Sequence, residues 1–291
     1  MSIKQIYLLM HIIHKKTELS NLIKEYKKKG KTIGFVPTMG ALHTGHLSLV
    51  DIARKNSDIV VVSIFVNPAQ FAPNEDLNKY PRQEKEDIDK LEEKSVEVVY
   101  LPSVAEMYPD GFKLNIELGE ASKILEGEIR PHFFSGVALV VIKLFMQILP
   151  DIAVFGEKDY QQLFIINKLV RGLNIPVKIM PGPIFRENSG LAMSSRNVYL
   201  KGDYLSKAAV LYTNMLQIKD DIIKNGNVAG SIDKGKEKLL KDGFETVDYI
   251  TLIDKEDFSI INSLNNNARL LIAARISGVR LLDNIDISVN N

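Results

Sequence analysis

The hydrophobic and polar positions in the first two thirds of the chain alternate between two kinds of segment. Short runs rich in Val, Ile and Phe predict strands. Residues 58–66, DIVVVSIFV, have the nearly unbroken β-branched pattern of a strand buried on both faces of a parallel sheet. Longer segments that mix charged and apolar residues lie between these runs and predict helices. The expected strands are Lys31–Val36, Asp58–Val66, Val96–Tyr100, Asp151–Phe155 and Val177–Met180, and the expected helices are Leu47–Lys55, Arg82–Lys94, Gly136–Ile148 and Tyr160–Gly172.

Strands that alternate with helices imply right-handed β–α–β crossovers and a doubly wound parallel sheet. We therefore expect an α/β fold of the Rossmann-like kind over residues 1–185. In such sheets ligands bind at the carboxyl ends of the strands, near the point where the strand order reverses. The main polar motifs of the chain come directly after expected strands, where such a ligand site would lie.

The pattern changes after about Leu200, where two helical segments precede three apolar strands, as is typical of a smaller α+β domain. We expect this domain to span residues 186–291, because Pro181-Gly182-Pro183 interrupts regular structure just before it. At the other end, His11–Ile13 is a candidate first strand and residues 1–9 a candidate extension. The elements expected in the second domain are helices Asp203–Lys224 and Ser231–Lys241 and strands Val247–Ile253, Ala268–Ile276 and Val279–Leu282.

Composition narrows the classes of function. Of 291 residues, 45% are apolar and 25% charged, as in ordinary globular proteins, and the formal net charge is +1. This balance gives no overall sign of a nucleic-acid or membrane partner. No apolar run reaches the roughly 18 residues of a membrane span. The chain has no cysteine, which excludes disulfides, thiolate zinc sites and a cysteine nucleophile and fits a reducing cytoplasm.

The segment PTMGALHTGH, residues 37–46, follows an expected strand and opens an expected helix. Gly40 and Gly45 remove side chains where a ligand could approach the backbone. A helix start presents unpaired N–H groups and a positive dipole end, which suit a phosphate. His43 and His46 are three residues apart, so both imidazoles can donate to one phosphate group as negative charge builds. Zinc is the rival interpretation, but no acidic or thiol third ligand is near in the sequence.

Further polar residues follow later strands or lie in a loop. Gln70 comes just past a strand end, where an amide can bind hydroxyl and carboxylate oxygens at once. Lys158 supplies a point charge for phosphates, and Asp159 could bind a ribose or orient Lys158. Gln162 is four residues beyond Lys158, on the same helical face. Residues 193–197, MSSRN, carry two hydroxyls and a guanidinium. Each of these residues taken alone is also explained by ordinary loop or surface polarity.

Residues 43–46 resemble the HxGH signature of a superfamily that includes class I aminoacyl-tRNA synthetases and nucleotidylyltransferases. Residues 193–197 are similar to its second phosphate-clamping loop, with serine and arginine in place of lysines. Together PTMGALHTGH, SIFVNPAQF, NEDLNKYPR, GEKDYQQL and MSSRN look like the motifs of the pantothenate synthetase (pantoate–β-alanine ligase) family, in its order and with similar spacing. The resemblance extends from Met10 to about Asp283. The run Arg280-Leu281-Leu282-Asp283-Asn284 is similar to the family's carboxyl-terminal strand.

The resemblance implies an ATP-dependent ligase. In the family, the carboxylate of pantoate attacks the α-phosphorus of ATP, which gives pantoyl adenylate and pyrophosphate. The amine of β-alanine then attacks the acyl carbon, and AMP and pantothenate are released. The implied partners are these small molecules, with Mg²⁺ beside ATP and neither nucleic acid nor membrane, in a cytoplasmic homodimer. The first domain would bind ATP and pantoate, and residues 186–291 would close over the site.

By motif, the resemblance places His43 and His46 on the phosphates, with His46 as the proton donor. Lys158 and Arg196 would be further catalytic cations. Phe185 would contact adenine through its backbone. The residues expected to bind ATP are Met39, Gly40, Ala41, Leu42, His43, Thr44, Gly45, His46, Gly156, Glu157, Lys158, Asp159, Phe185, Met193, Ser194, Ser195 and Arg196.

The acid substrate and the metal are assigned in the same way. Gln70 and Gln162 would hold pantoate by its hydroxyl and carboxylate oxygens, and Asn67 and Tyr80 would shape the pocket. Mg²⁺ would be held mainly by phosphate oxygens and waters. Asp87 is a candidate indirect ligand, although a solvated helix face explains this residue about as well.

The chain departs from the family in one motif. The family commonly has Arg-Pro-Gly-His-Phe before a helix, whereas this chain has Arg130-Pro131-His132-Phe133-Phe134. Without a gap, Phe133 takes the place of the family histidine, so we expect no site role for Phe133. Either His132 substitutes from one residue away, or the contact is lost.

Three other functions remain open at this point. A nucleotidylyltransferase of the same superfamily would use the histidine turn but would not need Gln70 and Gln162 to face a hydroxy acid. A synthetase-like RNA-binding protein should carry a basic stripe, against which the net charge of +1 argues. A non-catalytic nucleotide sensor is favoured only by the change at Phe133.

Overall fold

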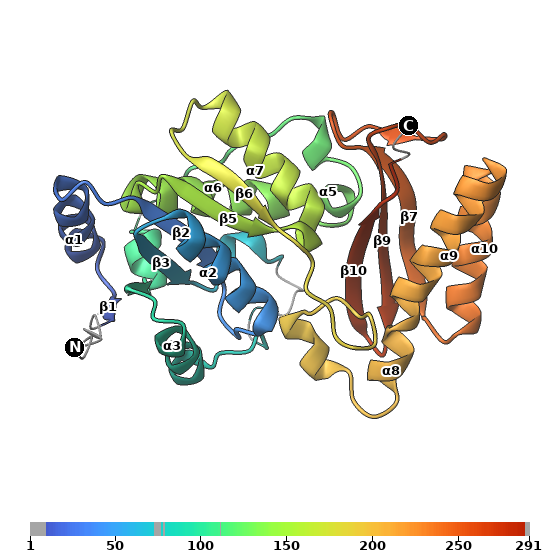
Figure 1. The fold of residues 1–291 in the computed structure, drawn as a ribbon, viewed down its shortest axis with the longest axis horizontal. Helices are drawn as coiled ribbons and strands as arrows, with labels where there is room; N and C mark the ends of the chain where they lie inside the picture. The colour runs from blue at the N-terminus through green and yellow to red at the C-terminus, as the bar shows by residue number, and fades with distance from the viewer. Residues whose placement is uncertain (1–9, 73–76, 78, 111, 289–291) are drawn as a thin grey trace, which may run out of the picture. The chain divides into compact units, whose positions relative to one another are not determined.

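The computed structural model describes residues 10–72, 77, 79–110 and 112–288. Residues 1–9, the candidate extension, and most of the segment 73–78 in the NEDLNKYPR motif lie outside the described residues. The chain divides into two compact units (Figure 1). The first unit runs to Glu157 and resumes over Gln162–Gly182; the second comprises Lys158–Gln161 and the chain from Pro183 onward.

The first unit is built on six parallel strands with helices between them. The strands are β1 (His11–Ile13), β2 (Ile33–Thr38), β3 (Ile59–Ile64), β4 (Val98–Tyr100), β5 (Ile152–Gly156) and β6 (Lys178–Gly182). The main helices are α1 (Lys16–Lys28), α2 (Thr44–Asn56), α3 (Glu84–Glu93), α6 (Phe133–Ile148) and α7 (Tyr160–Gly172), the last of which starts among the residues of the second unit. Shorter segments are α4 (Val104–Met107), α5 (Glu126–Ile129) and the 3₁₀ turns η1 (Pro68–Gln70) and η3 (Glu120–Ser122). The 3₁₀ turn η4 (Glu157–Asp159) begins in the first unit and continues into residues of the second.

Helices cover both faces of this sheet because successive side chains of a strand point to opposite sides. Val36 of β2 belongs to the apolar cluster that contains Leu49 and Val50 of α2. The neighbouring Phe35 packs edge-on against Phe145 of α6 on the other face, with ring centroids 6.2 Å apart. The two-sided burial explains why these strands are continuous apolar runs in the sequence.

The strand order is β1-β4-β3-β2-β5-β6, so it reverses where β2 lies between β3 and β5. The carboxyl ends of β2 and β5 lead into residues 39–43 and into Glu157, and that of β3 leads into η1. In a doubly wound sheet this switch point is where ligands bind. The histidine turn and Gln70 therefore lie at the edge of the sheet where a ligand is expected.

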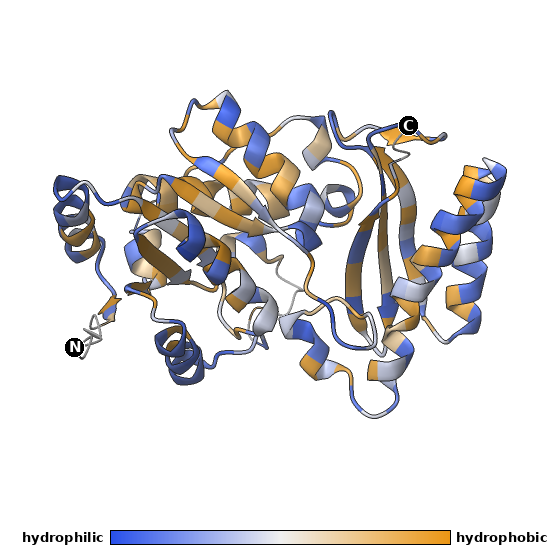
Figure 2. Cartoon of the chain, in the orientation of Figure 1, coloured by the Kyte–Doolittle hydropathy of each residue, from blue (hydrophilic) through white to orange (hydrophobic). Residues whose placement is uncertain are grey.

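The second unit has an antiparallel sheet in the order β10-β9-β7-β8, backed by helices on one face (Figure 1). Its strands are β7 (Thr246–Asp254), β8 (Ile260–Ile261), β9 (Ala268–Ile276) and β10 (Val279–Asp286), and its helices are α8 (Tyr204–Ala208), α9 (Val210–Asn225) and α10 (Val228–Lys241). A further 3₁₀ segment is η5 (Ser195–Tyr199). Figure 2 shows the apolar residues along the sheet and on the side of α9 that faces it. They form one core, of which Leu252, Leu270 and Ile272 are fully buried members.

The fold class expected from the sequence is confirmed: a doubly wound parallel sheet with a smaller α+β part. Two expected bounds differ from those in the structure. Pro181 and Gly182 do not interrupt β6 but end it, because β6 pairs only with β5 and an edge strand tolerates proline. The expected helix Asp203–Lys224 is divided at Ala209 into α8 and α9. Helix α1 was missed, although Leu19, Ile23 and Tyr26 have the spacing of its buried face.

Candidate active site

The turn between β2 and α2 is held in an unusual backbone conformation. Gly40 has a φ of +84° and Ala41 a φ of +51°, both in the left-handed region that residues with a side chain rarely adopt. The N–H groups of Ala41 and Leu42 donate to the carboxylate oxygens of Asp87 at 2.8 and 2.7 Å. These two N–H groups therefore point to a carboxylate of α3, which the sequence did not suggest.

His43 and His46 cap the first turn of α2 reciprocally. His43 Nδ1 accepts a hydrogen bond from the N–H of Gly45 at 3.1 Å, and His46 Nδ1 accepts one from the N–H of His43 at 3.4 Å. An Nδ1 that accepts carries no hydrogen, so the ring hydrogen of each imidazole is on Nε2. The two ring centroids are 4.0 Å apart. Both rings are thus oriented as Nε2–H donors from the same turn.

This capping corrects one expectation. The start of α2 does not present a full set of unpaired N–H groups, because the N–H of Gly45 is bound by His43 Nδ1 and that of His46 by the His43 carbonyl oxygen at 2.8 Å. Two of the backbone N–H groups at the start of α2 are therefore already bound within the turn itself. The positive end of the α2 dipole still lies at this turn.

Gln70 is held by a buried network that fixes the orientation of its amide. Asn67 Oδ1 accepts from the Tyr108 hydroxyl at 2.8 Å and from the Ala69 N–H at 3.2 Å, so Asn67 Nδ2 faces Gln70 Oε1 at 3.1 Å. Burial raises the pKa of Tyr108 to about 12, which keeps its hydroxyl a donor. Gln70 Nε2 is consequently on the opposite side, 2.9 Å from the sulfur of Met39. The NH₂ group of Gln70 faces the turn that follows β2.

Close packing behind Gln70 requires a glycine. A Cβ on Gly136 of α6 would lie 2.1 Å from the carbonyl oxygen of Ala69, so only glycine lets α6 approach η1 this closely. Asn67 Nδ2 also donates to the Gly136 carbonyl at 3.1 Å. The polar network is therefore tied to the helix that covers it.

The changed motif before α6 has a structural role of its own. Arg130 donates to the backbone carbonyl of Gln70 at 3.0 Å, and its guanidinium carbon lies 3.9 Å from the centre of the Phe133 ring. Phe133 thus supports the arginine that holds Gln70. His132 precedes α6 and is exposed. Its substitution for the family histidine stays a prediction.

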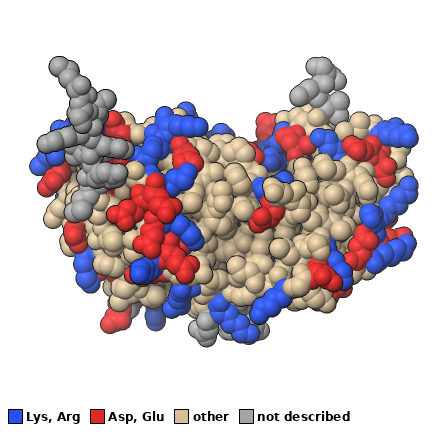
Figure 3. Space-filling view, turned by 60° about the horizontal axis from the view of Figure 1, so that its bottom comes forward, with Lys and Arg blue, Asp and Glu red and all other residues tan. Residues whose placement is uncertain are grey.

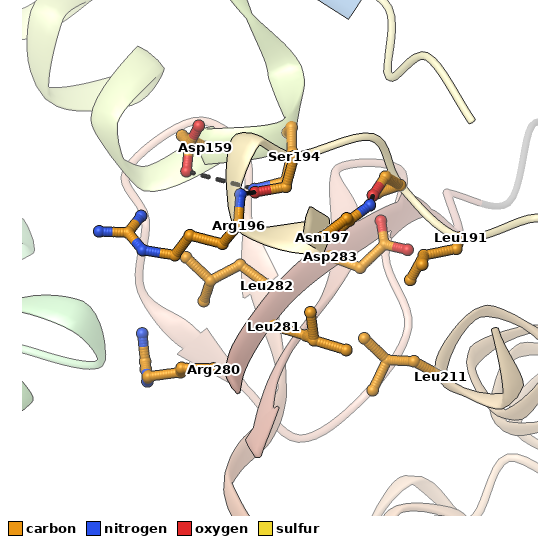
Figure 4. Close-up of a pocket in the computed structure, with 12 residues that line it drawn as sticks. Asp159, Leu191, Ser194, Arg196, Asn197, Leu211, Arg280, Leu281, Leu282 and Asp283 are labelled. Carbon is orange, nitrogen blue, oxygen red and sulfur yellow. Dashed lines mark hydrogen bonds and ion pairs between the residues drawn. The ribbon is translucent and has the colours of Figure 1, made fainter. Parts of the chain in front are cut away.

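Several expected ATP-binding residues line a pocket of the second unit (Figure 4). Lys158 and Asp159 form an ion pair at 3.8 Å. Ser194 Oγ accepts from the Arg196 N–H at 3.3 Å, which orders the start of η5. The expected residues brought together here are Lys158, Asp159, Ser194 and Arg196, and the pocket adds Leu191, Ala192, Asn197, Leu211, Arg280, Leu281, Leu282 and Asp283.

A second network, which sequence reasoning missed, supports this pocket. Arg186 makes a bidentate ion pair with Asp283, with N–O distances of 2.6 and 2.9 Å, and its guanidinium lies 3.8 Å from the Tyr212 ring centre. Asn284 Nδ2 donates to the Lys158 carbonyl at 2.9 Å and its Oδ1 accepts from Arg269 at 2.6 Å. The adjacent polar pair Asp283-Asn284 within the apolar pattern of β10 was the available signal.

Four other expected residues, Phe185, Gly156, Gln162 and Tyr80, are not among the residues that line this pocket. Phe185 is 43% exposed, and its carbonyl accepts from the Met193 N–H at 2.9 Å, so that carbonyl already has a donor. Gly156 ends β5 in the first unit. Gln162 is half-buried in the first turn of α7. Tyr80 is buried, with its ring 6.0 Å from that of Phe71.

Asp87 is fully buried, so the interpretation of this residue as part of a solvated helix face is wrong. Burial raises the pKa of Asp87, and the bonds from the N–H groups of Leu42 and Ala41 act in the opposite direction. Lys90, one turn later in α3, donates to the Leu42 carbonyl at 2.8 Å. Asp87 and Lys90 therefore bind the two backbone polar groups of Leu42, its N–H and its carbonyl oxygen.

The described part of the chain adds three observations, on surface charge, on metal ligands and on helix length. Acidic and basic side chains are interspersed on the face drawn in Figure 3. Among the described residues, no three His, Asp or Glu side chains group as a metal site, and none of the described helices is long and apolar enough to cross a bilayer.

Known proteins match the chain over nearly its whole length. The family model described as pantoate-beta-alanine ligase matches residues 11–286. The pantothenate synthetase of Caldicellulosiruptor saccharolyticus is 45% identical, covering 96% of this chain and 100% of its own, and that of Aquifex aeolicus is 45% identical, covering 94% and 98%.

Solved structures agree with the sequence relatives. The pantothenate synthetase of Thermus thermophilus superposes with a TM-score of 0.90 at 40% identity and covers 96% of this chain and 100% of its own. The pantoate-beta-alanine ligase of Francisella tularensis, complexed with beta-gamma ATP and beta-alanine, has a TM-score of 0.81 at 37% identity over 97% and 99%. The motifs, the fold and these matches agree, and the chain belongs to the pantoate–β-alanine ligase family.

Proposed function

We propose that the histidine turn, the two glutamines and the cationic pocket divide the work of the family reaction, the ATP-dependent condensation of pantoate with β-alanine. In the first step a pantoate carboxylate oxygen bonds to the α-phosphorus, and the bond to the bridging oxygen of pyrophosphate breaks. In the second step the β-alanine amine bonds to the acyl carbon and loses a proton, while AMP leaves with the electrons of the C–O bond. Neither step needs an enzyme nucleophile.

His43 and His46 stabilise the charge that develops on the phosphate oxygens in the first step. The observation that carries this proposal is the reciprocal capping, which keeps Nδ1 of each ring as an acceptor and Nε2–H as a donor. A donor fixed before the substrate arrives needs no reorganisation as the charge builds, and this is the condition for a large electrostatic contribution. His46 is proposed as the principal donor.

Gln70 and Gln162 recognise pantoate. The Asn67 network leaves Gln70 Nε2 as the side of the amide that can donate to a hydroxyl or carboxylate oxygen. Arg130 donates to the backbone carbonyl of Gln70, so this residue is held at its backbone as well as at its side chain. An amide held in this way distinguishes an acid with a suitably placed hydroxyl from one without it.

ATP is the nucleotide substrate, and the second unit contributes Lys158, Ser194 and Arg196 to its phosphates. A lysine acts as a point charge and an arginine as a two-pronged donor, so both suit phosphate oxygens. The closing movement expected for residues 186–291 stays a prediction. A homodimer and a cytoplasmic location also stay predictions, and sedimentation would test the homodimer.

Mg²⁺ is proposed to accompany ATP and not to occupy a protein cage. The described residues hold no group of three acidic or histidine side chains, and both oxygens of Asp87 accept backbone N–H groups. Mg²⁺ keeps several waters and binds substrate phosphates in many enzymes, which fits this donor set. Its contribution when bound would be to neutralise phosphate charge.

The function is tested by incubating the purified protein with ATP, Mg²⁺, pantoate and β-alanine and following AMP and pantothenate. We expect AMP release that requires both pantoate and β-alanine in steady state, and pyrophosphate exchange into ATP that requires pantoate alone. AMP release that ignores omission of pantoate would contradict the ligase. Transfer of AMP to a phosphorylated acceptor would instead indicate a nucleotidylyltransferase.

Replacing Gln70 or Gln162 with alanine should impair use of pantoate far more than use of ATP. Loss of one buried hydrogen bond at a recognised substrate predicts an increase in KM for pantoate of about tenfold to a hundredfold. Steady-state kinetics with each substrate varied in turn measure the difference. Gln217→Ala, an exposed glutamine of α9, is the matched control. Equal losses for pantoate and ATP would refute the assignment.

A further inference from the structure

The turn that delivers the histidines is not stable by local preference. Ala41 has a φ of +51°, a conformation that costs free energy for any residue with a Cβ, and Gly40 has a φ of +84°. A Cβ on Gly40 would lie 3.0 Å from both Asp87 Oδ2 and Ile64 Cγ2. Something outside the turn must hold it, and the turn is packed directly against the carboxylate of Asp87.

Helix α3 supplies two opposite charges to this turn. The two oxygens of Asp87 accept from consecutive N–H groups, those of Ala41 and Leu42, at 2.8 and 2.7 Å. Lys90 Nζ donates to the Leu42 carbonyl at 2.8 Å. Charged partners make such bonds shorter and stronger than those between neutral groups. Leu42, the residue that precedes His43, is therefore held at both its N–H group and its carbonyl group.

The contacts of Asp87 with Ala41 and Leu42 and of Lys90 with Leu42, together called the clamp, end one residue before His43. Leu42 leads directly into His43, whose N–H is bound by His46 Nδ1. A change in the direction of the Leu42 peptide would move the His43 N–H and break the reciprocal capping, and with it the Nε2–H orientation of both rings. The remaining apolar contacts of α3, such as Leu91, hold the helix against the same core as Leu42.

We propose that Asp87 and Lys90 are positioning residues for the ligase reaction, which hold the left-handed turn Gly40–Leu42 so that His43 and His46 meet the nucleotide phosphates with their Nε2–H groups. This inference rests on the proposed role of the histidine turn. Asp87 is then needed as an acceptor of backbone N–H groups, and its oxygens are directed to the turn.

Asp87→Asn tests the acceptor role with almost no change of shape. An amide has one acceptor oxygen and places an NH₂ group against a backbone N–H, so one clamp bond is lost and two donors face each other. We expect kcat at saturating substrates to fall at least about tenfold, because small misplacements of catalytic groups are costly, with the KM for pantoate little changed. Asp89→Asn, the same change on the exposed side of α3, should behave as wild type.

The imidazole ¹⁵N signals provide a readout that a merely structural role would not change. The chain has five histidines, and the signals of His43 and His46 should show the Nε2–H form in the wild-type protein. In folded Asp87→Asn those two should lose the pure Nε2–H pattern while the other three keep theirs. A kcat equal to that of Asp89→Asn, or unchanged signals of His43 and His46, would overturn the proposal.

Lys90→Met keeps the test decisive if Asp87→Asn does not fold, because Lys90 is only half-buried. We expect a smaller fall in kcat, of about three- to tenfold, with the same change in the imidazole signals. An unaltered kcat in Lys90→Met would overturn the clamp. Failure of the wild-type protein to form AMP in response to pantoate would instead refute the proposed function, so the two failures are distinguishable.

Discussion

Replacing His46 with alanine is expected to lower kcat by about a hundredfold to a thousandfold while the protein stays folded. The reason is the loss of a fixed donor to developing phosphate charge, whose removal typically costs this much in a preorganised site. Binding of ATP in the ground state should change little, because the interaction strengthens as the charge builds. Pre-steady-state formation of pantoyl adenylate would locate the loss in the first step.

Two matched variants separate the donor from the cap. His46→Gln retains an acceptor that can reach the His43 N–H, as glutamine does at this position in a capping box, but has no imidazole donor. We expect it to melt close to the wild-type temperature and to be nearly as slow as His46→Ala. His11→Ala, at an exposed position of β1, should be as active as the wild type. A His46→Gln variant with near-normal turnover would show that the ring is needed only for capping.

Replacing Arg186 with methionine is expected to give the largest loss of stability. Asp283 is 3% exposed and is bound by both guanidinium nitrogens of Arg186, while the N–H of Asn284 is its other neighbouring donor. Removal of one partner leaves a buried charge uncompensated, which costs about 3–5 kcal/mol. Melting of the second unit should fall by at least about 10 °C, which calorimetry or circular dichroism would measure.

The same pair offers internal controls. Arg186→Met combined with Asp283→Asn should recover part of the loss, because no net charge is then left buried. Lys238→Met breaks a partly exposed i,i+4 pair with Asp242 and should change stability by less than about 0.5 kcal/mol. A single Arg186→Met variant as stable as Lys238→Met would show that the buried Asp283 does not depend on this ion pair.

The sequence predicted the parallel sheet because burial on both faces leaves a simple trace, a continuous run such as that of β3. It predicted the histidine turn because two imidazoles in one glycine-bracketed segment are rare by composition. It could not predict that Asp87 is buried against the turn after β2, because nearly every position of α3 is charged and one buried carboxylate looks like its exposed neighbours. Only the spacing of Asp87 to the buried Leu91, one turn later, marks the inner face of the helix.

The rest of the candidate site depends on contacts between segments far apart in the chain. Asn284 meets the Lys158 carbonyl across 126 positions, and Arg186 meets Asp283 across 97. Side chains such as Asn67, which was expected only to shape a pocket, acquire a definite task once Tyr108 and Gly136 are beside them. Residue type and local spacing carry no information about such partners.

The chain leaves the first unit at Lys158, returns at Gln162 and leaves again at Pro183, so the tetrapeptide Lys158–Gln161 belongs with the second unit. Tyr160 lies under the guanidinium of Arg269 and stacks on Phe258, and Lys158 is bound by Asn284. A hybrid of two relatives joined at a single point near residue 183 would therefore take this tetrapeptide from one parent and its partners from the other. Recombination or engineering of this protein has to treat residues 158–161 and 183–288 as one inherited block.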